Sequence, residues 1–293
     1  MFEKKIKRNI LLNPGPATTS DNVKYAQIVP DICPREDEFI KLMKEIRLDL
    51  LKIVNADPSR YTSVLFGGSG TSIMESVLAS SVNDDKQLVI LVNGAYGERM
   101  QSIAKTYKLN YNVFEYTWGT PINFDDIELY LKNNSNVKYL AMVHHETTTG
   151  ILNSIEKFSQ IGTKYNCVTI LDAISSYCGM RIDINETPVD YLMSTSNKCI
   201  QGMAGLAFAI CDKYKLSLLK SSSKRLYYLS LYDQFDYFEK NGQMRFTPPV
   251  QVTYALKEAI NELFEEGLDA RYKRYYENWS ILKSGLIKIG FKL

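Results

Sequence analysis

Histidine is scarce in this sequence of 293 residues, and long apolar runs and a large excess of either charge are absent. The two histidines, His144 and His145, are adjacent, so no histidine-built metal site is expected and we predict none. The 35 basic and 33 acidic residues are interleaved and give a formal net charge of +2, which argues against a dedicated nucleic-acid surface. No apolar run is long enough to span a bilayer, and none follows the basic N-terminus as in a signal peptide. These absences predict a cytoplasmic protein that binds neither membrane nor nucleic acid.

Cysteine is also infrequent. The five cysteines are odd in number and include no CxxC pair, which favours reduced thiols over a disulfide framework. The remaining composition, with 45% hydrophobic and 23% charged residues, is typical of a globular protein. A chain of this length forms one large domain, or a large domain with a smaller one.

Apolar patterns predict strands that alternate with helices along the chain. The predicted strands are residues 61–66, 87–92, 138–143, 167–171 and 206–211. The predicted helices are residues 38–54, 73–82, 155–165, 250–265 and 268–288. This alternation indicates an α/β fold in which helices cover both faces of a mostly parallel sheet. Ligands bind such sheets at the carboxyl ends of the strands, and several of the predicted strands are followed by polar segments.

Lys198 lies on a polar turn between two apolar runs, residues 191–193 and 206–211. Burial lowers the pKa of a lysine, and a neutral amine in such a place is able to bond covalently to an aldehyde. Taken alone, this segment fits a surface lysine on a hairpin loop better. Other strand ends reverse that preference.

The segment GGSGTS, residues 67–72, joins a predicted strand to a predicted helix. The unpaired N–H groups of a helix N-terminus suit a phosphate, and Ser69 and Thr71 add hydroxyl donors. The segment lacks the Gly-Lys-Ser/Thr ending of a nucleotide P-loop and the GxGxxG dinucleotide pattern, so a simple glycine-rich turn is the alternative.

Three further side chains follow predicted strands. Asp172 ends a run of aliphatic residues, where a carboxylate needs a positive or donor partner such as a protonated ring nitrogen. A helix N-cap explains Asp172 equally well. Tyr96 suits stacking on a flat ring and Thr147 suits donation to its edge, although core packing and a plain turn explain them too. With the phosphate segment and Lys198, these residues form the set that pyridoxal 5′-phosphate (PLP) requires.

The same motifs resemble those of the class V aminotransferases, in the fold-type I superfamily of PLP enzymes. In chain order they are NPGPATTS, GGSGTS, NGAYGERM, AMVHHETTTG, LDAISSY, NKCIQG and RFTPP. Within this family, HHETTTG and NKCIQG resemble the subgroup that transfers the amino group of 2-aminoethylphosphonate to pyruvate. The resemblance covers nearly the whole chain, and it implies a three-layer α/β/α fold and a PLP-dependent transaminase that yields phosphonoacetaldehyde and L-alanine.

The resemblance also implies roles around the cofactor ring. Lys198 would bond covalently to PLP and act as the catalytic base. Asp172 would pair with the ring nitrogen. Tyr96 and Ile174 would lie against opposite faces of the ring, and Thr147 would donate a hydrogen bond near it.

The cofactor phosphate has its own implied ligands. By the same resemblance, Ser69, Gly70 and Thr71 would bind it together with Asn197. Thr247, in RFTPP, matches a residue that reaches the cofactor phosphate of the neighbouring subunit. The resemblance therefore implies a homodimer with a shared active site.

Three regions are expected: an N-terminal arm (1–20), a PLP-binding large domain (21–265) and a helix leading into an incomplete small domain (266–293). In the family, that small domain carries the arginine that binds the anionic group of the substrate, and here the sequence ends at Leu293. Three explanations for the absence of this arginine remain open: a shortened protein, a small domain outside this sequence and a non-catalytic relative of the fold. For the reaction itself, the alternative is a class V transaminase that acts on serine or alanine with glyoxylate. Arg35 fits a solvated surface arginine better than a substitute anion ligand.

Overall fold

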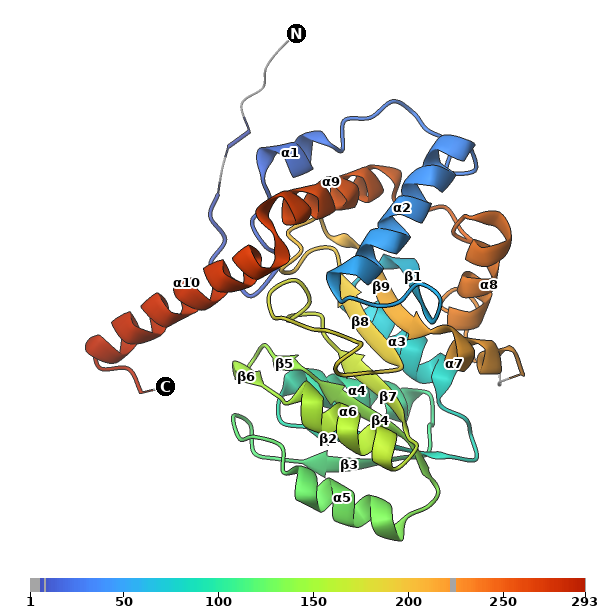
Figure 1. The fold of residues 1–293 in the computed structure, drawn as a ribbon, viewed down its shortest axis with the longest axis vertical. Coiled ribbons are helices and arrows are strands. Elements are labelled where there is room, and N and C mark those ends of the chain that lie inside the picture. The colour runs from blue at the N-terminus through green and yellow to red at the C-terminus, as the bar shows by residue number, and fades with distance from the viewer. Residues whose placement is uncertain (1–5, 8, 222–224, 293) are drawn as a thin grey trace.

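The computed structural model describes residues 6–7, 9–221 and 225–292, and its core is a seven-stranded sheet (Figure 1). Across the sheet the strands are β1 (Tyr61–Gly68), β9 (Gly205–Asp212), β8 (Tyr191–Thr195), β7 (Val168–Asp172), β4 (Val137–Val143), β2 (Gln87–Val92) and β3 (Tyr111–Glu115). A separate antiparallel hairpin pairs β5 (His145–Glu146) with β6 (Ile151–Leu152). The strands predicted from the apolar runs are therefore present.

The sheet is mostly parallel, as the sequence predicts. Among the described strands, β9 alone runs antiparallel to both of its neighbours, β1 and β8. The pairs β8–β7, β7–β4, β4–β2 and β2–β3 are parallel. The carboxyl ends of β1, β2, β4, β7 and β8 therefore lie at one edge of the sheet, together with the amino end of β9.

Helices cover the sheet on both faces (Figure 1). One layer contains α3 (Gly70–Ser81), α4 (Ala95–Thr106), α7 (Lys213–Leu218) and α8 (Leu231–Asn241). The other contains α1 (Asp21–Tyr25), α2 (Asp37–Ile53), α5 (Phe124–Asn133), α6 (Ile155–Lys164) and α9 (Val250–Glu266). A short 3₁₀ helix, Leu219–Ser221, follows α7, and α10 (Leu268–Lys288) continues from α9. The central strands are buried on both faces, which explains why their sequences are almost continuously apolar.

The amphipathic pattern of residues 38–54 forms α2, whose buried side chains include Phe39, Met43, Ile46 and Leu50. Burial of such an apolar stripe, at spacings of three and four residues, is what stabilises a helix of a globular protein. Asp57 and Pro58 then lie between α2 and β1.

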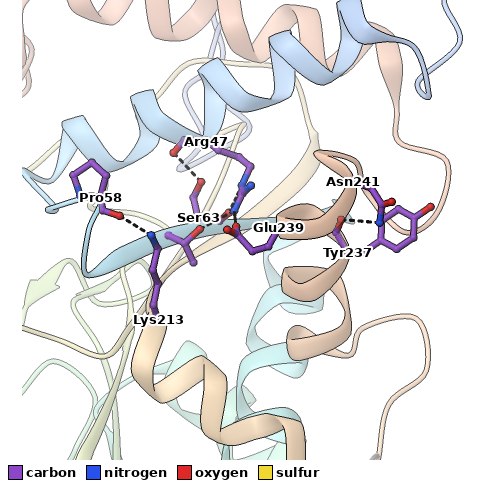
Figure 2. A network of polar contacts seen from close by, with 8 residues as sticks. Arg47, Pro58, Ser63, Lys213, Tyr237, Glu239 and Asn241 are labelled. Carbon is purple, nitrogen blue, oxygen red and sulfur yellow. Dashed lines mark hydrogen bonds and ion pairs between the residues drawn. The ribbon is translucent and has the colours of Figure 1, made fainter.

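Polar contacts anchor the edge strand β1 to its neighbours (Figure 2). The guanidinium of Arg47 on α2 donates to the Ser63 carbonyl at 2.9 Å and pairs with Glu239 of α8 at 2.7 Å. The Ser63 hydroxyl donates back to the Arg47 carbonyl at 2.9 Å, and Lys213 donates to the Pro58 carbonyl at 2.6 Å. The edge of the sheet is thereby covered by two helices, which limits its pairing with other strands.

Some elements differ from the expectations. The sequence analysis did not predict β3, α5 or α8. After α10, residues 290–292 form a turn and irregular backbone, and Leu293 lies outside the described residues. Helix α10 projects from the body, with Trp279 and Leu282 exposed by 52% and 62% (Figure 1).

Candidate active site

A cavity of about 400 Å³ opens at the edge of the sheet where the parallel strands end. Its wall comes from four strand ends and the start of β9. The lining residues are Gly68, Ser69, Gly70, Thr71, Tyr96, Arg99, Ile174, Thr195, Asn197, Lys198, Ala204 and Gly205. Seven of the ten residues predicted to bind the cofactor are among them. This position agrees with the rule that α/β sheets bind ligands at their carboxyl edge.

Lys198 follows β8 on the turn that leads to β9, and it is half-buried. Its Nζ donates to the carbonyl of Pro14, in the N-terminal arm, at 3.1 Å. A Cβ added to Gly15 would lie 2.6 Å from Nζ, and Gly15 has φ +133°, so glycine fits this position for both space and conformation. Burial lowers the pKa of Lys198, and the nearby Cys199 and Asp172 act in the opposite direction. Burial therefore favours the neutral, nucleophilic amine.

Asp172 ends β7, and its side chain is buried with 2% exposure. Its Oδ1 accepts a hydrogen bond from the Ile174 N–H at 2.8 Å, while Oδ2 has no partner among the described residues. Burial raises the pKa of Asp172 to about 7, although the positive charges of Arg99 and Lys198 oppose this rise. A buried carboxylate oxygen without a donor is costly. A protonated ring nitrogen supplies the missing donor and charge, so the residues present fit PLP.

The phosphate segment forms the start of α3, a helix of 12 residues. Ser69 is its N-cap residue, and its side chain makes no capping hydrogen bond. A Cβ at Gly70 would lie 2.8 Å from Ile174 Cδ1, so glycine lets the start of α3 approach the Ile174 wall. Free N–H groups at such a helix start suit an anion.

Three predicted residues do not line the cavity. Asp172 lies in the sheet two residues before Ile174, which does line it. Thr147 follows the β5 strand, and its hydroxyl is 2.6 Å from the Ser175 hydroxyl. Thr247 is exposed in the segment before α9.

Arg99 is a cavity residue that the sequence analysis did not assign. Its guanidinium lies 4.7 Å from the centroid of the Tyr96 ring, and its Nη1 donates to Thr71 Oγ1 at 3.3 Å. The signal available was its position three residues after Tyr96, which places both on one face of α4. Arg35, in contrast, is exposed and donates to the carbonyls of Met244 and Arg245, so it holds the segment before α9.

The titratable residues of the HHETTTG segment form no metal site. His144 is buried with its Nδ1 2.9 Å from the Ser176 hydroxyl, and burial lowers the pKa of His144 to about 4. Across residues 6–7, 9–221 and 225–292, no group of three or more His, Cys, Asp or Glu side chains is placed to hold a metal ion. Within the same ranges no helix is both long and apolar enough to cross a bilayer.

Lys198, whose pKa is lowered by burial, and a hydroxyl-bearing helix start line one cavity, and the unpaired carboxylate oxygen of Asp172 is buried in the strand that ends beside it. On this fold, these features are those expected of an enzyme that uses PLP. The family model for class V aminotransferases matches residues 23–290, and the chain belongs to this family. It is a PLP-dependent aminotransferase, and both the fold and the family expected from the sequence are confirmed.

Curated relatives cover nearly the whole chain. A 2-aminoethylphosphonate–pyruvate transaminase of Bacteroides fragilis (strain YCH46) is 38% identical over 98% of this chain and 79% of its own length. A protein of the same name from Bacillus cereus is 39% identical over 97% of this chain and 82% of its own length.

Solved structures show the same fold at lower identity. An alanine–glyoxylate aminotransferase from Nostoc sp. has a TM-score of 0.91 at 24% identity, covering 100% of this chain and 78% of its own. A pyridoxamine–pyruvate aminotransferase from Mesorhizobium loti has a TM-score of 0.90 at 21% identity, covering 97% of this chain and 72% of its own.

Proposed function

We propose that the protein transfers the amino group of 2-aminoethylphosphonate to pyruvate, giving phosphonoacetaldehyde and L-alanine. The observation that carries this proposal is one cavity that presents Lys198 and Arg99 beside the buried, unpaired carboxylate of Asp172. Both substrates are anions, and a guanidinium is a suitable partner for a phosphonate or a carboxylate. The names of the relatives, at 38–39% identity over most of the chain, support the same substrates.

Lys198 is proposed to bind PLP and to move the proton in catalysis. When bound, PLP supplies an electron-withdrawing ring that stabilises negative charge on the substrate carbon bearing nitrogen. Nζ of Lys198 takes the proton from that carbon and holds it until it is returned. Because burial lowers the pKa of Lys198, more of the amine is neutral and able to accept this proton at pH 7. Asp172 keeps the ring nitrogen protonated by accepting its hydrogen bond.

Two walls are proposed to hold the ring, with Tyr96 on one face and Ile174 on the other. Thr147, fixed by its contact with Ser175, is proposed to orient the edge of the ring. The order of these residues around one cavity supports this arrangement, since Tyr96 and Ile174 both line it.

The start of α3 is proposed to bind the cofactor phosphate, through Ser69, Gly70 and Thr71 with Asn197. Thr247 is proposed to reach the phosphate of a neighbouring subunit, in a cytoplasmic homodimer with shared active sites. Its exposure supports this role, because an exposed side chain is accessible to a second copy.

The proposed division of the chain follows the same reasoning. An N-terminal arm (1–20) and a PLP-binding domain (21–265) are proposed, and the hydrogen bond from Lys198 to the Pro14 carbonyl supports a role for the arm beside the site. Residues 266–293, which include α10, are proposed as a segment separate from this domain. The projection of α10 from the body of the molecule supports treating these residues apart from the large domain (Figure 1).

The test is an assay of purified protein with PLP, 2-aminoethylphosphonate and pyruvate, in which L-alanine and phosphonoacetaldehyde are both measured. Equal amounts of the two products are expected, and Lys198→Ala should yield neither. Faster turnover of serine or alanine with glyoxylate would assign the other transaminase activity. Binding of PLP without turnover of any pair would assign a non-catalytic relative.

A further inference from the structure

We propose that Glu146 is a positioning residue that fixes the start of α4, and with it the Tyr96 ring, against the bound cofactor. This inference rests on the proposed function only in taking Tyr96 as the wall against which the PLP ring lies. It does not depend on which amine or keto acid the enzyme uses.

The carboxylate of Glu146 is fully buried and accepts hydrogen bonds from the first turn of α4. Its Oε1 accepts from the Gly97 N–H at 2.7 Å, and its Oε2 accepts from the Tyr96 N–H at 3.3 Å. The preceding amide, of Ala95, donates to the Thr148 hydroxyl at 3.3 Å. Three successive N–H groups of this helix start are therefore satisfied by one segment of the HHETTTG motif.

The helix has no cap of its own, because its N-cap residue is Gly94, which has no side chain. A Cβ at Gly94 would lie 2.6 Å from Glu146 Oε2, so the absence of a side chain there lets the carboxylate reach the amides. The φ of Gly94 is 177°, which any residue adopts, so the requirement is for space. The cap comes from Glu146, about fifty positions away in the sequence. Loss of its carboxylate therefore uncaps the helix and also breaks a contact between two distant segments.

The same segment also contacts the opposite wall of the cavity. Thr147, next to Glu146, is 2.6 Å from the Ser175 hydroxyl, and Ser175 follows Ile174. Residues 146–148 thus bind the start of α4 on one side and the turn after β7 on the other. The separation between Tyr96 and Ile174, which a planar ring must match, is set by this connection.

The buried charge suits this role. A carboxylate at a helix N-terminus is favoured by the N–H groups and the helix dipole. Burial raises the pKa of Glu146, and the bonds from Gly97 and Tyr96 counteract that rise. A glutamine at this position has the same shape but only one accepting oxygen. Its amide N–H₂ would therefore face one of the two backbone N–H groups that Glu146 now binds.

The test is Glu146→Gln, measured by PLP titration of the ligand-free protein and by visible circular dichroism of the PLP-bound protein without substrate. We expect the dissociation constant of PLP to rise about tenfold, and the ellipticity of bound PLP to fall at saturation, because a charged hydrogen bond to the Tyr96 wall is lost. The matched control is Glu98→Gln, which removes a partly exposed acid from the same turn of α4. It should leave both readouts within twofold of wild type.

A drop in thermal stability of Glu146→Gln with unchanged PLP affinity and ellipticity would overturn the proposal, because Glu146 would then be a fold-stabilising cap alone. If Glu146→Gln does not fold, Thr148→Val removes the neighbouring cap more gently and must still lower the ellipticity of bound PLP. Wild-type protein that binds PLP but does not act on 2-aminoethylphosphonate would refute the proposed substrate and leave this inference standing.

Discussion

The isosteric substitution Asp172→Asn should stabilise the ligand-free protein at high pH while weakening PLP binding. The carboxylate is buried and one of its oxygens is unpaired, so ionisation without a ligand is costly. Its pKa rises from 3.8 to about 7. At 1.36 kcal/mol for each pKa unit, folding disfavours the ionised form relative to the protonated form by about 4 kcal/mol. The amide carries no charge and avoids that cost.

The direction of the pH dependence follows from this raised pKa. The folded protein binds the Asp172 proton more tightly than the unfolded chain does. This contribution to stability is complete below pH 3.8 and is lost as the pH rises through about 7. The difference in unfolding free energy between Asp172→Asn and wild type should therefore shift by up to about 4 kcal/mol in favour of the variant between pH 4 and pH 8. An unsatisfied amide N–H₂ costs about 1–3 kcal/mol at every pH, so the variant is the less stable protein at pH 4.

When PLP is bound, the substitution is expected to be unfavourable. The wild-type carboxylate gains a charged hydrogen bond worth about 1.5–3 kcal/mol, so the variant should bind PLP about 10- to 100-fold more weakly. Denaturant unfolding of ligand-free protein from pH 4 to pH 8.5, followed by PLP titration, measures both effects. A stability difference that is constant with pH, or equal PLP affinity, would refute the reasoning.

Three further substitutions test the other parts of the site. Lys198→Ala should abolish turnover and the visible absorbance of lysine-bound PLP, and wild-type turnover in this variant would overturn the assignment of the base. Gly15→Ala should lower turnover and stability together, because the added Cβ would lie 2.6 Å from Lys198 Nζ and the φ of +133° disfavours a side chain. Activity assays and thermal melts measure these effects, and unchanged turnover and melting temperature would contradict the prediction. Arg99→Gln should raise the KM for 2-aminoethylphosphonate or the dissociation constant of PLP at least severalfold, because a cation is lost from the cavity. Steady-state kinetics and PLP titration measure the two constants, and Arg181→Gln, at an exposed surface arginine, is the control. An Arg99→Gln enzyme that matches the control in both constants would remove Arg99 from anion binding.

The sequence predicted much of the fold because its signals are local. Apolar runs such as 167–171 ending at Asp172 mark buried parallel strands and their carboxyl ends directly. The antiparallel direction of β9 was not predicted, since a buried strand has the same apolar pattern in either direction. Helix α8 was missed because its aromatic residues are weak helix formers and gave no clear helical signal.

The position of the cavity was predictable where polar residues follow a strand end, as at Lys198. The role of a residue was not predictable where it depends on packing between distant segments. Glu146 acquires its partners only when the β5–β6 hairpin lies against the start of α4. Arg99 lines the cavity because α4 turns that face toward α3. Its spacing from Tyr96 indicates that the two residues share a helix face, but not the direction in which that face points.

The contact between Pro14 and Lys198 has a practical consequence for handling the protein. The arm also donates from the Ala17 N–H to the Asn197 carbonyl at 2.9 Å, so two hydrogen bonds, one of them from the Lys198 side chain, connect it to the lysine turn. A protease cut near Pro14 or Ala17 during purification would therefore remove direct contacts of Lys198 and its turn. Preparations with the arm verified as intact by mass spectrometry are the appropriate material for kinetic work.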